Sequence, residues 1–193
     1  MIVWGKKEMQ LKWEINDYIL IWELLFRASI SKDVQNYKQK LWKNYKHSYN
    51  ALTKEKGVIL KEPKNYIPND DTIFDIVRNS ELYQELKQET EDYKNHFLKC
   101  YEEEKKNMEK ELKQIIRLEL NPCHILLLHP KLDIIEIKTG AEYFILWGRR
   151  KDEQDYKMAL LNLIHIILAK KLEKSQPEYR EYQEIVQAII ELA

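Results

Sequence analysis

Between Pro68 and Pro122 the sequence contains neither glycine nor proline. The whole chain of 193 residues has only 4 glycines and 5 prolines, and lysine, glutamate and leucine are frequent. Such a composition favours long helices over many short strands. Asp70 or Asp71 is placed to cap a helix that extends to about Leu120, either as one helix or as two with a kink. The sequence therefore predicts a strongly α-dominated protein.

The residues before this stretch predict two further helices. Apolar and aromatic side chains recur at helical spacing from Glu8 to Ala28, which predicts the first helix. Ser31 can cap a second helix that would end at Gly57. Two prolines then exclude a continuous helix and predict a linker. We expect an N-terminal helical pair at residues 1–56, a linker at residues 57–71, and a part at residues 72–193 with the long central helix, a small sheet and two C-terminal helices, all packed into one compact domain.

A region near residues 123–148 departs from the helical pattern. The strings CHILLL, DIIEIK and EYFILWG are short, rich in strand-forming residues and separated by turns. Because each link is too short for a parallel crossover, we expect three antiparallel strands. Helices are predicted after them at Lys151–Leu172 and from Ser175 onward. The predicted fold class is α+β, a helical bundle with a small three-stranded antiparallel sheet. The predicted core consists of Trp22, Leu25, Leu41, Ile135, Ile137, Ile145, Leu160, Ile164, Ile167, Ile185 and Ile189.

The charge and cysteine content exclude several classes of protein. Lysine and arginine together number 32, as do aspartate and glutamate, so the net charge gives no global attraction to a phosphate backbone. Binding to a nucleic acid would therefore need a local basic patch. Cys100 and Cys123 are too few for a disulfide framework, which predicts a reducing compartment. No apolar run is long enough to span a bilayer, so we expect a cytoplasmic protein without a membrane partner.

The most basic segment of the chain lies in the second predicted helix. There Lys40, Lys43 and Lys46 alternate with Trp42 and Tyr45. Lysines of this kind can contact phosphates, and the aromatic rings between them can stack on bases, which makes these five residues the candidate nucleic-acid-binding site. The structural alternative is a helix with an aromatic core face and a solvated lysine face. Exposed tyrosine and tryptophan are also enriched at protein interfaces.

A second candidate site is the triplet Glu136-Ile137-Lys138 on the middle predicted strand. The acid and the lysine would share one face of the strand, with the apolar residue between them facing the core. The triplet resembles the second half of the signature of the PD-(D/E)xK nucleases. That resemblance implies hydrolysis with Mg²⁺ or Mn²⁺, with Glu136 as a metal ligand and Lys138 helping to activate water. Cys123 and His124 stand on the preceding strand where that family has its second acid, so the candidate second ligand is His124 or an acid that the sequence does not identify. The alternative is a solvent-facing Glu/Lys pair on a hairpin.

Arg117 and His124 offer a third interpretation. Their spacing resembles the arginine–histidine element of the HEPN ribonucleases, in which the two residues converge at a helix end. Here Leu118 replaces the polar residue that usually follows the arginine, and Pro122 interrupts the backbone between the pair. The alternative is an arginine on a charged helix and an unrelated histidine on a strand.

These patterns lead to two hypotheses about function. The first is a non-enzymatic helical interaction or regulatory protein that needs no cofactor and binds another protein or a nucleic acid. The second is a divergent metal-dependent nuclease centred on Glu136 and Lys138. Self-association through the long central helix is a further possibility. The hypotheses differ in their dependence on residues: the binding protein tolerates Glu136→Ala, whereas the nuclease loses its activity.

Overall fold

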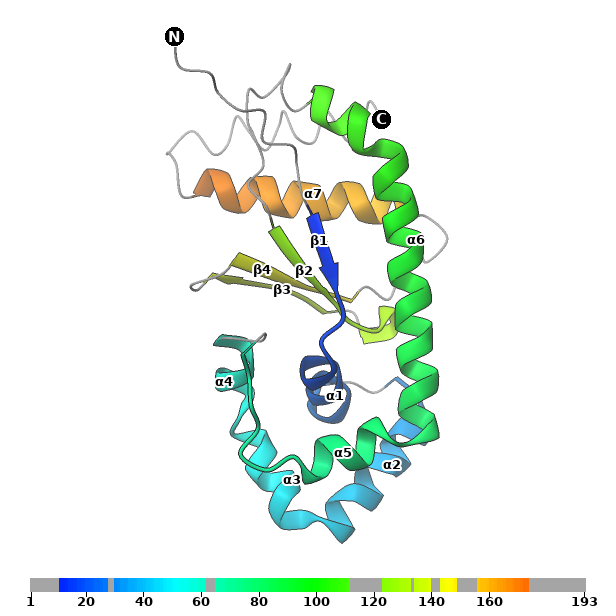
Figure 1. Ribbon diagram of the computed structural model, residues 1–193, viewed down its shortest axis with the longest axis vertical. Coiled ribbons are helices and arrows are strands. Elements are labelled where there is room, and N and C mark those ends of the chain that lie inside the picture. Colours follow the sequence, from blue (N-terminus) through cyan, green and yellow to red (C-terminus); the bar gives the residue numbers. More distant parts are fainter. Residues whose placement is uncertain are drawn as a thin grey trace. The chain divides into compact units, whose positions relative to one another are not determined.

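The computed structural model describes residues 11–27, 30–61, 65–111, 123–132, 134–139, 143–148 and 156–173 (Figure 1). The contacts within the chain divide it into two compact units, described separately below. The larger unit comprises residues 11–95 and 123–153, and the smaller one residues 1–10, 96–122 and 154–193. The elements are β1 (Leu11–Glu14), α1 (Asp17–Phe26), α2 (Lys32–Asn44), α3 (Lys46–Thr53), α4 (Lys56–Lys61), α5 (Thr72–Arg78), α6 (Glu81–Glu111), β2 (Cys123–Leu127), the 3₁₀ turn η2 (Pro130–Leu132), β3 (Ile134–Thr139), β4 (Tyr143–Gly148) and α7 (Tyr156–Glu173).

The larger unit contains a mixed sheet with the strand order β1-β2-β4-β3. The mostly helical α+β class is confirmed, and so are the positions of the three predicted strands. The prediction of a purely antiparallel three-stranded sheet is wrong. Only β3 and β4 pair antiparallel, whereas β4 pairs parallel with β2, and β2 pairs parallel with a fourth strand, β1.

The connection between β2 and β3 explains this topology. It does not form a hairpin but lies against the end of β4, where the backbone N–H of Leu128 donates to the carbonyl of Trp147 at 2.8 Å. Gly148 provides the space for it. A Cβ atom at that position would lie 2.9 Å from the carbonyl oxygen of His129 and 2.9 Å from the Cβ of Leu128. Because β4 thus lies between β2 and β3, these two strands are not neighbours in the sheet, although β3 follows β2 in the sequence.

The first predicted helix begins later than expected. Residues Leu11–Glu14 form β1 instead, in which Leu11 and Trp13 are buried and Lys12 is exposed, as the two-residue period of a strand requires. The helix α1 begins only at Asp17. The side chain of Asn16 caps it by accepting a hydrogen bond from the N–H of Ile19 at 3.1 Å.

The second predicted helix is divided into three. Ser31 caps α2 as expected, because its hydroxyl accepts from the N–H of Val34 at 3.2 Å. The chain leaves helical geometry at Tyr45, where φ is −133° and ψ is 41°, and α3 begins one residue later. Gly57 does not end a helix but lies within α4. The segment predicted as a linker therefore contains most of α4, and it also buries Tyr66 in the core of the unit.

The long central helix is present in its two-helix form as far as Glu111, and the rest of the predicted helix lies outside the described residues. Asp70 accepts a hydrogen bond from the N–H of Thr72 at 3.0 Å before α5 begins. The helix α5 ends at Arg78, and α6 begins at Glu81. In the first turn of α6 the hydroxyl of Ser80 accepts a hydrogen bond from the N–H of Tyr83 at 3.3 Å. Local hydrogen bonds from short polar side chains thus mark both helix starts.

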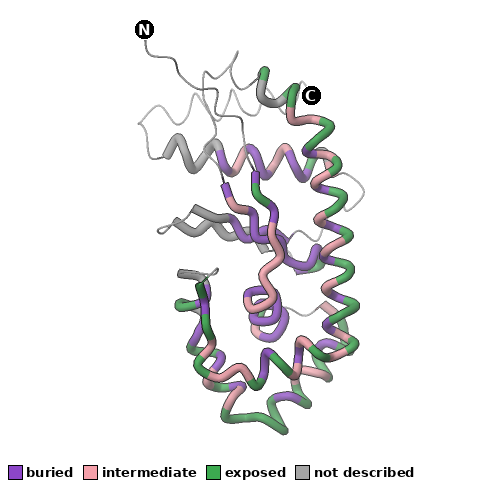
Figure 2. Tube along the Cα trace, viewed as in Figure 1, coloured by how far each residue is buried: buried purple, intermediate pink, exposed green. Residues whose placement is uncertain are grey.

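The core of the larger unit is centred on α1, which is buried along Ile19–Leu25 (Figure 2). A helix that is apolar on nearly every side requires neighbours all round, and α2 to α5 contribute buried side chains to the same cluster. The burial of four predicted core residues in this unit and three in the smaller one is confirmed: Trp22, Leu25, Leu41 and Ile145, and Leu160, Ile164 and Ile167. The side chains of Ile135 and Ile137, and the residues Ile185 and Ile189, lie outside what the structure describes.

The smaller unit contains α7 and the part of α6 from His96 onward. The ring of Tyr156 stacks on His96 with a centroid distance of 4.7 Å and meets Phe97 edge-on at 5.7 Å. Leu160 and Leu163 are buried on α7, which confirms the predicted buried helix within Lys151–Leu172 from Tyr156 onward. Across the described ranges, none of the helices combines the length and the apolar character needed to cross a membrane.

Candidate nucleic-acid interface

The break at Tyr45 produces an exposed bend between α2 and α3. We call residues 40–47 the elbow; it extends from the last turn of α2 to the first turn of α3. Figure 2 shows this bend as largely exposed. Trp42 is 44% exposed and Tyr45 is 40% exposed. The five residues of the predicted nucleic-acid-binding site are all exposed there: Lys40, Trp42, Lys43, Tyr45 and Lys46.

The fold separates the aromatic residues of this segment into two groups. The hydroxyl of Tyr49 donates to the carbonyl of Leu25 at 3.2 Å, and the hydroxyl of Tyr37 donates to that of Ile76 at 3.4 Å. Burial raises the pKa of Tyr49, so its hydroxyl keeps its proton. These two tyrosines therefore belong to the core, as the structural alternative predicted. The rings of the elbow, by contrast, remain at the surface.

The indole of Trp42 has one ordered neighbour within the elbow. The ammonium group of Lys46 lies 5.1 Å from the ring centroid, which is a cation–π contact. The two residues are four positions apart, and this spacing still brings them together although the helix breaks at Tyr45 between them. At an exposed site such a contact contributes about 0.5–1 kcal/mol, enough to bias the ring orientation without burying it.

The elbow lies within a locally basic part of a neutral chain. Between residues 32 and 54 there are six lysines and one aspartate, whereas the whole chain has zero net charge. Asp70 borders this patch: hydrogen bonds from Ser48 and Thr72, and the nearby His47, lower the pKa of its carboxyl group. Even with this carboxylate ionised, the patch keeps an excess of positive charge, which a neutral protein needs if it is to bind a polyanion.

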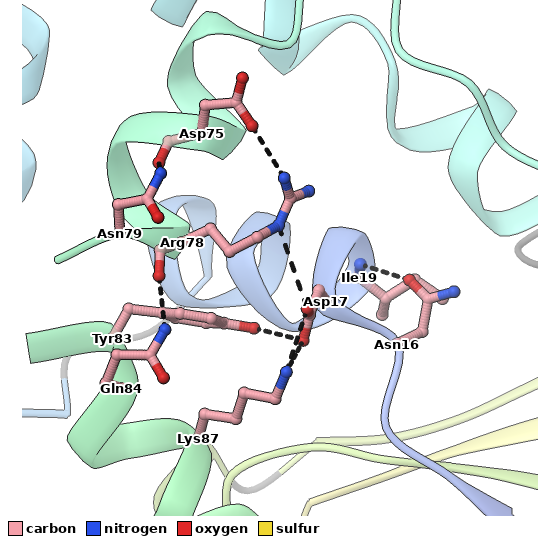
Figure 3. Close-up of polar contacts among 9 residues, drawn as sticks. All are labelled: Asn16, Asp17, Ile19, Asp75, Arg78, Asn79, Tyr83, Gln84 and Lys87. Atoms are coloured by element: carbon pink, nitrogen blue, oxygen red, sulfur yellow. Dashed lines mark hydrogen bonds and ion pairs between the residues drawn. The ribbon is translucent and has the colours of Figure 1, made fainter.

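An ionic cluster around Asp17 links α1, α5 and α6 (Figure 3). The carboxylate accepts a hydrogen bond from the hydroxyl of Tyr83 at 2.9 Å and contacts the ammonium group of Lys87 at 2.9 Å. Arg78 approaches it at 4.0 Å and pairs with Asp75 at 2.8 Å. Burial, then the charge of Asp17, raises the pKa of Tyr83, so the phenol remains a donor. The cluster ties the start of α1 to the end of α5 and to α6.

The backbone register places the nuclease candidates without bringing them together. Glu136 is opposite Leu146, and Lys138 is opposite Phe144, whose other neighbour in the register is His124. The strand between β3 and β2 therefore has the sequence YFILWG, which contains no acid. Two strand spacings, about 10 Å, separate β3 from the strand of His124. Because the side chains of β3 lie outside the described part of the structure, this metal site stays a prediction.

Sequence reasoning missed a polar pair formed by a buried histidine and an exposed acid. His129 is fully buried, and its Nε2 lies 2.8 Å from Oε2 of Glu89 on α6. Its Nδ1 accepts from the backbone N–H of Lys131 at 3.2 Å, so Nε2 carries the proton and donates to the carboxylate. Both ring nitrogens are thereby engaged, and the imidazole has no lone pair left for a general base. The pair fastens the β2–β3 connection to α6, and its members are 40 residues apart, so no local signal announces it.

Cys123, next to the candidate ligand His124, carries a buried thiol. Burial raises the pKa of the Cys123 thiol to about 12, which keeps it protonated and a poor nucleophile or metal ligand. Within the described ranges, no group of three or more histidine, cysteine, aspartate or glutamate side chains could hold a metal ion. Arg117, the partner of His124 in the HEPN-like pair, lies outside the described residues.

Comparisons with known proteins add no relative: no family model matches the chain, and searches of curated proteins and of solved structures find no significant match. The function is therefore inferred from the residues and geometry of this chain. Two arrangements are relevant to it, namely the exposed elbow with its five predicted residues and the strand that carries Glu136 and Lys138.

Proposed function

We propose that this protein is a non-enzymatic helical binding protein whose partner is a nucleic acid, held at the elbow. The observation that carries the proposal is the exposure of three lysines and two aromatic rings at one bend. Lysine supplies the phosphate contacts that dominate affinity for nucleic acids. Exposed tryptophan and tyrosine supply flat surfaces for bases, which a purely polyanionic partner would not need.

Charge complementarity favours a nucleic acid over a protein partner. A protein interface of ordinary composition is depleted in lysine, whereas Lys40, Lys43 and Lys46 dominate the elbow. The neutral charge of the whole chain also argues for a local site, because no other attraction would draw a polyanion to the protein. An acidic protein partner remains the competing occupant, and the experiment below separates the two. Self-association through α6 stays a prediction.

The test is the binding of fluorescently labelled DNA and RNA, single- and double-stranded, measured by anisotropy across a range of salt concentrations. The triple variant K40Q/K43Q/K46Q removes the lysines of the elbow. The matched control K99Q/K106Q/K110Q removes three exposed lysines of α6, with the same change in net charge.

We expect wild type to bind with a steep salt dependence. In the elbow variant the slope of log K against log salt should be less negative by about 2, since each phosphate contact contributes about 0.7–0.9 to its magnitude. The control should bind like wild type. Failure of wild type to bind any of these nucleic acids, or equal losses in both triple variants, would overturn the proposal.

A further inference from the structure

We infer that the elbow takes single-stranded nucleic acid and that an unpaired base stacks on the ring of Trp42. This inference rests on the proposed function and makes it more specific. It assigns the phosphates to Lys40, Lys43 and Lys46 and the discrimination between single and double strands to the indole.

The exposure of Trp42 is the first observation behind the inference. The other tryptophans that the structure describes, Trp13, Trp22 and Trp147, are at most 9% exposed, whereas Trp42 is 44% exposed. Trp22 also donates its indole N–H to the carbonyl of Leu52 at 3.2 Å. An exposed indole offers a flat apolar surface on which another ring can stack.

The second observation is the charge around the ring. Lys40 and Lys43 are three positions apart on α2 and project from the same face, and Lys46 follows on α3 with its ammonium group 5.1 Å from the indole centroid. A base on the exposed part of this ring would have its own phosphate within reach of Lys46. The elbow thus combines a stacking surface with cations on both sides of it along the chain.

The exposed rings of the elbow favour single-stranded over double-stranded nucleic acid. In a duplex the faces of the bases are covered by their neighbours, so a flat side chain can reach only base edges. Only an unpaired base can offer its face to Trp42 or to the second exposed ring, Tyr45. A binding surface built from exposed rings and lysines therefore favours single strands and tolerates different sequences, because every base has such a face.

The experiment compares three probes: a labelled oligothymidylate, an abasic oligonucleotide of the same length, and the duplex of oligothymidylate with oligoadenylate. Each is bound to wild type, W42F and W42L at one salt concentration. The control I67A removes a side chain outside the elbow that is 84% exposed. Circular dichroism checks that all variants fold, which the exposure of Trp42 leads us to expect.

We expect wild type to prefer oligothymidylate to both other probes and to lose tryptophan fluorescence when it binds. W42L should weaken binding of oligothymidylate roughly five- to 150-fold, the equivalent of losing one stacked base, and leave binding of the abasic strand unchanged. W42F keeps an aromatic ring, so its affinity for oligothymidylate should lie between those of wild type and W42L. I67A should bind like wild type. Wild type and W42L, each bound to oligothymidylate and to the abasic strand, form a thermodynamic cycle. Its coupling free energy differs from zero only if a base stacks on Trp42.

Two results would overturn parts of this account in distinguishable ways. If wild type binds the abasic strand or the duplex as tightly as oligothymidylate, the stacking inference fails, although nucleic-acid binding through the lysines stands. If wild type binds none of the three probes, the proposed function fails with it, and an acidic protein becomes the partner to seek.

Discussion

Gly148 offers a direct test of the sheet topology, because its lack of a side chain makes room for the β2–β3 connection. In Gly148→Ala the new Cβ would lie 2.9 Å from the carbonyl oxygen of His129 and 2.9 Å from the Cβ of Leu128. Ordinary contacts between nonbonded carbon atoms lie at about 3.5–4.0 Å. One of the two atoms belongs to the backbone, so the clash can be relieved only if the connection itself moves.

The expected cost follows from these contacts. Overpacking a buried site typically destabilises a protein by about 1–3 kcal/mol. Replacing glycine also restricts the unfolded chain, which favours the folded state by about 0.4–1 kcal/mol. We therefore expect a net loss of about 1–2 kcal/mol for Gly148→Ala. Gly57 is the matched control: nothing lies within 4 Å of a Cβ added there, and the residue lies within α4. Gly57→Ala should stabilise the protein by about 0.5–1 kcal/mol.

Urea unfolding followed by far-ultraviolet circular dichroism measures both variants. The midpoint should fall for Gly148→Ala and rise for Gly57→Ala, with the slope m unchanged in each. The opposite signs separate a steric effect from a general response to replacing glycine. A Gly148→Ala protein as stable as wild type would refute the reasoning, since the connection could not then lie against the end of β4 as described.

The Asp17 cluster, the Glu89–His129 pair and the nuclease alternative each give one further prediction. Tyr83→Phe removes one hydrogen bond to the carboxylate of Asp17 and should lower the unfolding free energy by about 1 kcal/mol, measured by urea unfolding; no loss would contradict the cluster. Partial burial raises the pKa of Glu89, but the hydrogen bond from His129 and the charge of Lys131 outweigh it and lower the pKa overall. The ionised carboxylate therefore stabilises the fold at pH values above the ordinary carboxyl pKa. This stabilisation is lost as the pH falls through the pKa that Glu89 has in the folded protein. Glu89→Gln should therefore flatten the fall in thermal stability below about pH 5, and an unchanged acid limb would exclude the pair as its source. Under the nuclease alternative, cleavage of labelled DNA or RNA with Mg²⁺ or Mn²⁺ would be present in wild type and lost in Glu136→Ala; we expect no cleavage by either protein.

Local signals in the sequence predicted the starts of α2 and α5. Ser31 and Asp70 accept hydrogen bonds from backbone N–H groups two or three residues further along, and such a contact depends only on neighbouring residues. The three strands near the C-terminal end were likewise found from their own patterns. The burial of residues such as Trp22 and Leu41 followed from helical periodicity.

The errors arose where distant residues decide the structure. Leu11–Glu14 is too short to distinguish two-residue alternation from the start of a helix, and only its pairing with β2 makes it a strand. The order of the strands depends on the contact between Gly148 and the β2–β3 connection, which no local pattern contains. The break at Tyr45 has no glycine or proline to mark it; the bond from Tyr49 to Leu25 holds α3 against α1 instead.

The candidate site shows the same division. The alternation of lysines and aromatic residues identified the elbow, but the sequence could not separate Trp42 and Tyr45 from Tyr37 and Tyr49. That separation requires the core contacts of the latter pair. The pair of Glu89 and His129 could not be predicted at all, because its members come together only when α6 meets the β2–β3 connection.

The most direct test of the central claim is to map where a nucleic acid touches the protein. Single-stranded DNA containing iodouracil would be bound to wild type, cross-linked by light, and the attached peptides identified by mass spectrometry. The account predicts cross-links at Trp42 or Tyr45, which disappear when the lysines of the elbow are neutralised. Cross-links confined to another part of the chain would contradict it.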